Sequence, residues 1–252
     1  MNNNNSTWNV NIKNSGGYLI LVAILVFLLS ISFVASAPSA PIINYVTNTT
    51  YTSGIINRSI DAKGTITTVT LSSTQQDYKW KAYVGNVSGT LALADAGGKA
   101  IYDWSSGTVT GEVYISRYSN INWNNITCAV QSTIDAEQSN LSMASTIRDN
   151  INSTFNSSTH ASFLVGTTNI TSSSCRSIAT YLNGVPQALG PTANFQEILL
   201  RDSGTGNLVY AGLINAGVTG YNNANKYDFQ IIVGENESAT IPTNYYFWVE
   251  LG

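Results

Sequence analysis

Few side chains in this chain of 252 residues are of a type and at a spacing that could do chemistry. The single histidine, His160, lies in a run of Ser, Thr and Asn, so we expect it to be a structural or surface residue and not a catalytic base. The acidic residues are too scattered to indicate the carboxylate pair of a glycoside hydrolase. No P-loop, dinucleotide-binding, G-x-S-x-G or H-E-x-x-H motif occurs. We therefore expect a protein that is not an enzyme and that holds no cofactor or metal.

Two weaker patterns could bind a ligand. The Gly-rich loop of residues 202–207 carries oxygen ligands for calcium, but it lacks the acidic density of a dedicated site, which favours a plain turn. Asp77 near Trp80 and Asp103 beside Trp104 could form a sugar-binding platform, although core packing of the rings is favoured. We expect four tryptophans to lie in or beside strands and to fill the core: Trp80, Trp104, Trp123 and Trp248.

Charge is scarce along the chain. Asp, Glu, Lys and Arg make up 10% of the residues, against about 25% in an average soluble domain. Asn, Ser and Thr supply the polarity instead, and these residues favour turns and strands over helix interiors. The net charge of −3, with scattered Lys and Arg, leaves no basic patch. Nucleic acid is therefore excluded as an expected partner.

Residues 18–37, YLILVAILVFLLSISFVASA, form an apolar stretch without a charged side chain. At about 1.5 Å per residue, a helix of this length spans a bilayer. The polar residues 1–17 carry one cation, Lys13, and the first cation after the apolar stretch is Arg58. The positive-inside bias therefore places residues 1–17 in the cytoplasm and the following domain outside the cell.

Three fates of the apolar stretch are open, and all three export the domain. An uncleaved signal anchor fits its length and would hold the domain on the outer face of the membrane. The A-x-A sequence of residues 35–37 is a signal-peptidase pattern, although Pro38 after the cut is a poor fit and the stretch is long for a signal peptide. A pilin-like signal cut near Gly16 or Gly17 would leave an apolar helix for a filament core, although no Glu follows in its first turns.

Nine Asn-x-Ser/Thr sequons follow the apolar stretch, none with Pro at the middle position. A chain rich in Asn, Ser and Thr produces many such triplets by chance, but an exported chain can carry glycans at several of them. Each modified site must lie on the surface. The expected N-glycosylation sites are Asn48, Asn57, Asn86, Asn125, Asn140, Asn152, Asn156, Asn169 and Asn236.

Cys128 and Cys175 are the only two cysteines. In an exported chain we expect a single disulfide between them, which would stabilise the fold by about 4 kcal/mol in the chain-entropy model. Two separate buried thiols are the alternative. A zinc site would need more ligands than these cysteines and His160 supply.

The periodicity predicts strands almost throughout. Residues 38–75 form a linker with the first strands, and residues 76–252 form a β-rich ectodomain. The clearest hairpin is LALAD and KAIYDW around the turn of residues 96–98. Residues 197–214 repeat this pattern around a second Gly-rich turn, so the two hairpins could be copies of one unit.

The remaining elements complete an all-β pattern. Residues 107–117 alternate apolar and polar side chains, which predicts a half-buried strand. One short helix is expected at about 133–144, where acidic residues lie near its N-terminus. The fold class is therefore an antiparallel β-sandwich after a single N-terminal hydrophobic helix. Further expected elements are a weak strand at 121–126, a loop or edge strand at 148–159, and strands at 160–170, 227–233 and 244–251.

Seven segments follow one another between about residues 77 and 252: WKAYVGNVSGTLALADAGGKAIYDW, GEVYISR, NITC, DNINSTFN–STHASFLVG, FQEILLRDSG, NKYDFQIIVGENES and YYFWVELG. Their order resembles a poorly characterised family of exported archaeal surface proteins. The resemblance implies an extracellular, β-rich, glycosylated domain without an enzymatic motif. The N-terminal part is loosely similar to archaeal pilins.

These observations predict a non-enzymatic, exported glycoprotein of the cell surface with a structural, assembly or adhesion role. One alternative is a subunit of an extracellular pilus-like filament, in which the apolar helix or the terminal strand makes the lateral contact between copies. A second alternative is a carbohydrate-binding module that recognises surface glycans through Trp80 and Trp104.

Overall fold

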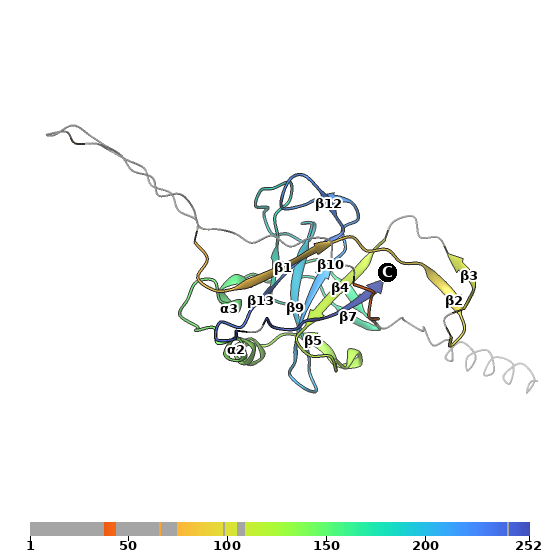
Figure 1. The fold of residues 1–252 in the computed structure, drawn as a ribbon, viewed down its shortest axis with the longest axis horizontal. Coiled ribbons are helices and arrows are strands. Elements are labelled where there is room, and N and C mark those ends of the chain that lie inside the picture. The colour runs from red at the N-terminus through yellow and green to blue at the C-terminus, as the bar shows by residue number, and fades with distance from the viewer. Residues whose placement is uncertain (1–37, 44–65, 67–74, 98, 105–108, 241) are drawn as a thin grey trace, which may run out of the picture. The chain divides into compact units, whose positions relative to one another are not determined.

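The computed structural model describes residues 38–43, 66, 75–97, 99–104, 109–240 and 242–252 (Figure 1). The expected apolar helix at 18–37 and the strands expected between residues 44 and 74 lie outside the described residues. Two compact units are distinguished, residues 1–35 and residues 36–252, and only the second contains described residues. Within the described part, no helix is both long enough and apolar enough to cross a membrane.

The centre of the fold is a sheet of six antiparallel strands: β4 (Gly111–Ser116), β5 (Ile126–Cys128), β8 (Ser177–Ala179), β9 (Gln196–Asp202), β10 (Leu208–Leu213) and β14 (Tyr246–Leu251). Strands β14, β4, β10 and β9 lie side by side in this order (Figure 1). At the outer edge of β14, the backbone of Ser39 exchanges two hydrogen bonds with Val249, of 2.8 and 2.9 Å.

The outer edge of β9 is covered by two half-strands, one after the other. β5 pairs with residues 200–202 of β9, and β8 pairs with residues 196–198. The partner changes at Leu199, whose C=O accepts from Ala129 N at 3.0 Å and whose N–H donates to Arg176 O at 2.8 Å. The expected disulfide between Cys128 and Cys175 is present at this point. The bond therefore joins the two half-strands into one edge.

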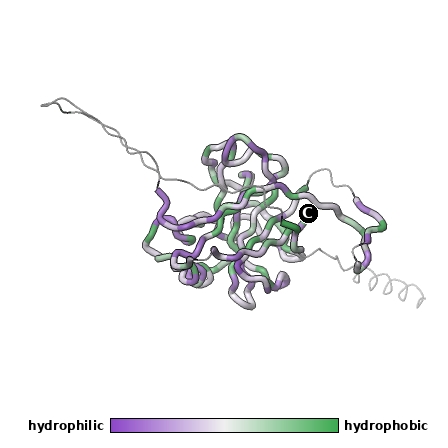
Figure 2. The backbone as a smooth tube through the Cα atoms, viewed as in Figure 1, coloured by the Kyte–Doolittle hydropathy of each residue, from purple (hydrophilic) through white to green (hydrophobic). Residues whose placement is uncertain are grey.

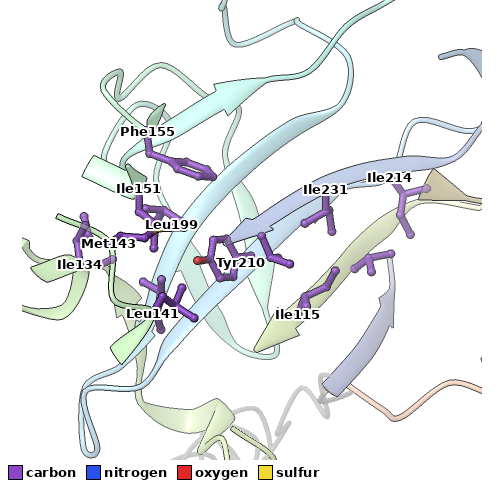
Figure 3. Close-up of a cluster of buried hydrophobic side chains, with 14 residues drawn as sticks. Ile115, Ile134, Leu141, Met143, Ile151, Phe155, Leu199, Tyr210, Ile214 and Ile231 are labelled. Atoms are coloured by element: carbon purple, nitrogen blue, oxygen red, sulfur yellow. The ribbon is translucent and has the colours of Figure 1, made fainter. Parts of the chain in front are cut away.

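One face of the sheet is covered by a two-stranded ribbon, β1 (Trp80–Gly85) with β13 (Phe229–Gly234), and by the helices α2 (Gln131–Asn140) and α3 (Ile151–Thr154). Leu199 and Tyr210 of the sheet meet Ile231 of the ribbon and Phe155 after α3 in one buried cluster (Figure 3). Gly212 allows the close approach, because a Cβ there would lie 2.6 Å from the Ile231 side chain.

The other face is covered by a small hairpin, β6 (Phe163–Val165) with β7 (Thr168–Ile170), and by the loop that carries Cys175. Phe163, Val165 and Ile170 pack there on Tyr114 and Val209 of the central sheet. The central strands are therefore buried on both faces, which explains why apolar residues run through β9 and β10 without alternation. Hydrophobic stretches follow these strands in Figure 2.

Three small elements lie outside this core: the hairpin of β2 (Leu91–Ala94) and β3 (Ala100–Trp104), the pair β11 (Val218–Thr219) and β12 (Lys226–Tyr227), and the 3₁₀ helix η1 (Trp123–Asn125). The expected class is confirmed at the level of secondary structure, since the described chain is mostly strand with few helical residues. Both predicted hairpins, at 91–104 and 197–214, are also present.

Several local expectations were wrong. The strand predicted as half-buried, β4, is buried on both sides, because a second layer covers each face of the sheet. The segment 148–159 contains the short helix α3, which begins after Asn150 because that side chain accepts from Ser153 N at 2.7 Å. The strand expected at 160–170 is a hairpin, because Gly166 adopts a positive φ and turns the chain. The strand expected at 121–126 is mostly η1.

We predict that replacing both cysteines by alanine lowers the free energy of unfolding by about 4 kcal/mol, because the bond closes a loop over a sequence separation of 47 residues. Urea unfolding of the oxidised protein and of the double variant measures the difference. Equal unfolding midpoints, or labelling of both thiols without a reductant, would contradict the prediction.

Candidate functional site

The most exposed apolar element of the described chain is the β2–β3 hairpin. Its strands pair with each other and with no other described strand, and every residue of β3 is exposed. The turn is built around Asp95, whose Oδ1 accepts from Gly97 N at 2.9 Å and from Lys99 N at 2.8 Å. An isolated two-stranded hairpin is marginally stable in water, so an element of this kind gains much by contact with a partner.

Apolar side chains occupy both faces of this hairpin. Leu93 lies opposite Tyr102 in the ladder, and the ring of Trp104 meets that of Tyr102 edge-on at a centroid distance of 5.1 Å. Ile101 points to the opposite face, since side chains alternate along a strand, and it is 82% exposed. Tyr102 and Trp104 are 58% and 52% exposed. We call Leu93, Ile101, Tyr102 and Trp104 the hairpin patch.

The two tryptophans considered for sugar binding have different environments. Trp80 is half-buried against the core, and its Nε1–H donates to Asp149 O at 2.9 Å. Trp123 and Trp248 also pack against the core, in mutual ring contact at 5.3 Å. Trp104 is exposed, so the expectation that it fills the core was wrong. Strand β3, which carries Trp104, lies outside the layers that bury the other three rings. The alternation of residues within β3 gives no sign of this position.

A second group of exposed rings was not predicted. Tyr181 and Tyr221 are both 48% exposed, and their backbones are joined by the buried Gln230. The Gln230 side chain donates to Tyr181 O at 2.8 Å and to Thr180 Oγ1 at 3.0 Å, and it accepts from Tyr221 N at 2.8 Å. The rings of Tyr221 and Tyr227 stack at 6.2 Å. No sequence signal indicated this surface, because residues 181 and 221 are brought together only by tertiary structure.

His160 is fully buried and has a structural role. Its Nδ1 is 2.6 Å from Ala161 O, and its Nε2 accepts from Ser174 N at 3.1 Å and from Cys175 N at 2.9 Å. This pattern requires the neutral tautomer with the proton on Nδ1. Burial accordingly lowers the pKa of His160, against the effect of its hydrogen bond to Ala161 O. The ring therefore positions the backbone beside the disulfide.

The loop considered for calcium is a hydrogen-bonded turn. Asp202 Oδ1 accepts from Gly204 N at 2.9 Å, and Oδ2 accepts from Thr205 Oγ1 at 3.0 Å and from Asn122 N at 3.2 Å. Burial alone would raise the pKa of Asp202, but these donors outweigh it and lower the pKa. Across the described ranges, no three His, Cys, Asp or Glu side chains gather as a metal site.

Charged side chains inside the fold connect its layers. Arg117, directly after β4, makes two hydrogen bonds of 2.6 and 2.7 Å to the carboxylate of Glu137 on α2. Glu137 is only 3% exposed. Lys81 of β1 pairs with Glu235 after β13. Burial alone would raise the pKa of Glu235, but Lys81 and the Thr243 hydroxyl lower it to about 2, with help from two backbone N–H groups.

Glu197 is a fully buried acid on β9. Its Oε2 accepts from Ile232 N at 2.9 Å, and this N–H lies on the edge of β13 that faces away from β1. Its Oε1 has no hydrogen-bond partner among the described residues. Burial raises the pKa of Glu197 well above its usual range, and the Ile232 N–H offsets this only in part. Through the hydrogen bond from Ile232 N, the Glu197 side chain attaches the ribbon to the sheet.

The predicted glycosylation sites fall into three groups. Asn48 and Asn57 lie outside the described residues. Asn152 and Asn236 are half-buried. The Oδ1 of Asn152 is buried without a hydrogen-bond partner among the described residues, and Asn236 Nδ2 donates to Asn140 O at 3.0 Å. The remaining five are exposed: Asn86, Asn125, Asn140, Asn156 and Asn169.

Comparison with family models, with curated proteins and with solved structures finds no match to this chain.

We predict that an exporting, glycosylating host modifies the exposed asparagines and leaves Asn152 and Asn236 bare, because a transferase must reach the side-chain amide. Of the exposed sequon asparagines, only Asn140 makes a side-chain hydrogen bond in the described structure, to the Tyr118 hydroxyl at 3.3 Å. Asn86, Asn125, Asn156 and Asn169 are therefore the preferred sites. Peptide mapping by mass spectrometry gives the occupancy of each sequon. Full occupancy at Asn236 with none at Asn86 would contradict the prediction.

Proposed function

We propose that the chain is an exported, non-enzymatic protein of the cell surface that makes an assembly or adhesion contact through the hairpin patch. The observation that carries this proposal is the exposure of Leu93, Ile101, Tyr102 and Trp104 on a hairpin that pairs with no other described strand. Exposed apolar side chains gathered on one element mark an interaction surface more often than scattered single residues do.

The remaining polar groups support a structural role. His160, Asp202 and Glu197, which could have served chemistry, each hold backbone groups in place. These three side chains are thereby committed to stability. A rigid body with one exposed apolar hairpin is suited to repeated contacts at a surface.

Export is part of the proposal and rests on the sequence. The apolar stretch 18–37, the nine sequons and the disulfide favour an extracellular location, either on the outer face of the membrane or secreted. The resemblance to exported archaeal surface proteins agrees with this location. We also propose that the central sheet and the β1–β13 ribbon are the two layers of a reduced β-sandwich, in which helices α2 and α3 replace part of the second sheet.

We predict that the full-length protein self-associates and that Tyr102→Ser with Trp104→Ser weakens the association by about 30-fold, the effect of losing about 2 kcal/mol at an interface hot spot. Analytical ultracentrifugation measures the association, and negative-stain imaging shows whether filaments form. Tyr181→Ser with Val185→Ser is the matched control, since it removes exposed apolar area elsewhere. Monodisperse monomers of the unmodified protein would refute self-assembly.

A second candidate function is carbohydrate recognition, which the exposed ring of Trp104 favours. An exposed aromatic face can stack on the apolar face of a sugar ring, and Tyr102 extends this surface. The half-buried Trp80 is unsuited to the same role.

We predict that Trp104→Ala removes binding on a glycan array if this second function is correct. Trp80→Phe is the control, because it keeps an aromatic ring against the core and should leave the binding unchanged. If the unmodified protein binds no glycan, or if Trp80→Phe removes binding and Trp104→Ala does not, the carbohydrate hypothesis fails.

A further inference from the structure

Two glutamates face each other across the strand pair that attaches the C-terminal strand to the sheet. Glu112 of β4 and Glu250 of β14 are direct partners in the antiparallel register, so their side chains lie on the same face of the sheet. They are 9% and 7% exposed. Like charges directly opposite each other destabilise a strand pair, and little water is present here to screen them.

The hydrogen bonds of the two carboxyl groups are unequal. Glu250 Oε2 accepts from Tyr114 Oη at 3.0 Å, and Gly166 N donates to Oε1 at 2.8 Å and to Oε2 at 3.1 Å. The Glu112 carboxyl makes no side-chain hydrogen bond within the described structure. Two donor groups, the Tyr114 hydroxyl and the Gly166 N–H, stabilise a carboxylate at Glu250. A charge on Glu112 would have no such donor among the described residues. Glu112 is therefore the member of the pair that holds a proton.

Among the described residues, no cation acts on the pair. On β4, the titratable neighbour of the two glutamates is Tyr114. On β10, the residue paired with Glu112 is Leu213. The turn between β6 and β7 contributes only backbone groups. Within the described structure, the one charge that acts on Glu112 is that of Glu250. Burial, and then this charge, raise the pKa of Glu112 to about 8. Burial also raises the pKa of Glu250, partly offset by its hydrogen bonds.

We propose that Glu112 and Glu250 form a proton-dependent latch on the C-terminal strand. While Glu112 carries its proton, β14 stays paired with β4, and the β6–β7 hairpin stays docked through Gly166. When both glutamates are ionised, their repulsion opens the end of β14 next to Gly111. The same strand holds Ser39 through Val249, so opening also weakens the contact of the N-terminal segment with the sheet.

The direction of the pH effect follows from the protons bound. Between pH 4.5 and about 8 the folded protein keeps a proton on Glu112 that the unfolded chain releases. The free energy of unfolding therefore falls as pH rises through this window and levels off above it. One such group changes the opening equilibrium by up to about tenfold per pH unit. The raised pKa of Glu197 also makes the free energy of global unfolding fall as pH rises. A measurement confined to β14 is therefore needed to separate the two glutamates.

Hydrogen exchange of the full-length protein, followed by mass spectrometry from pH 5 to pH 9, tests the latch. We expect the protection factors of β14 to fall at least about tenfold relative to those of β9 and β10 between pH 5 and pH 9. Glu112→Gln keeps the shape of the side chain without its charge and should hold the ratio constant. Glu197→Gln is the matched control and should leave the local opening of β14 intact.

Two outcomes would overturn the proposal. In one, β14 of the unmodified protein stays as protected at pH 9 as β10 does. In the other, Glu112→Gln opens with the same pH dependence as the unmodified protein. If Glu112→Gln does not fold, Glu250→Gln serves the same purpose, because its amide oxygen can still accept from Gly166 while the charge is removed. The test does not depend on the proposed surface function.

Discussion

The burial of the central strands on both faces is the constraint on which the rest of the structure depends. β4, β9 and β10 lie under the β1–β13 ribbon and helices on one side and under the β6–β7 hairpin on the other. A polar group on these strands has no solvent-facing side to turn to, so its burial costs free energy unless it finds a partner inside the protein. The covering layers come from other segments of the chain, and buried polar side chains such as Glu197 and Glu250 attach them.

The edge of β9 shows how this constraint was met. A single long partner strand is replaced by two short ones, β5 and β8, and the excursion between them supplies the helices and the hairpin that cover both faces. The disulfide closes this excursion at its base, and His160 fixes the backbone next to Cys175. Both cysteines and the only histidine of the chain thus serve one junction.

Much of the fold was predictable, and what was missed has a physical reason. Hairpins β2–β3 and β9–β10 were recognised because Asp- and Gly-rich turns are local signals. The disulfide was recognised because a chain with only two cysteines, if it is exported, leaves one pairing. Burial was harder to infer. Glu112 lies between apolar residues in a pattern typical of a half-exposed strand, and only the tertiary structure shows that its face is covered. The exposure of Trp104 escaped prediction for the converse reason, since nothing in its strand reveals that no layer covers it.

The contact between Ser39 and Val249 has a mechanical consequence. A pull on the chain at residue 38 reaches the folded body first at the edge of the C-terminal strand, where two hydrogen bonds bear the load. The next described strand along the chain is β1, which is paired with β13. The disulfide loop between residues 128 and 175 lies outside this load path. A pull from residue 38 therefore loads the edge of β14 before it loads the layers that the disulfide joins.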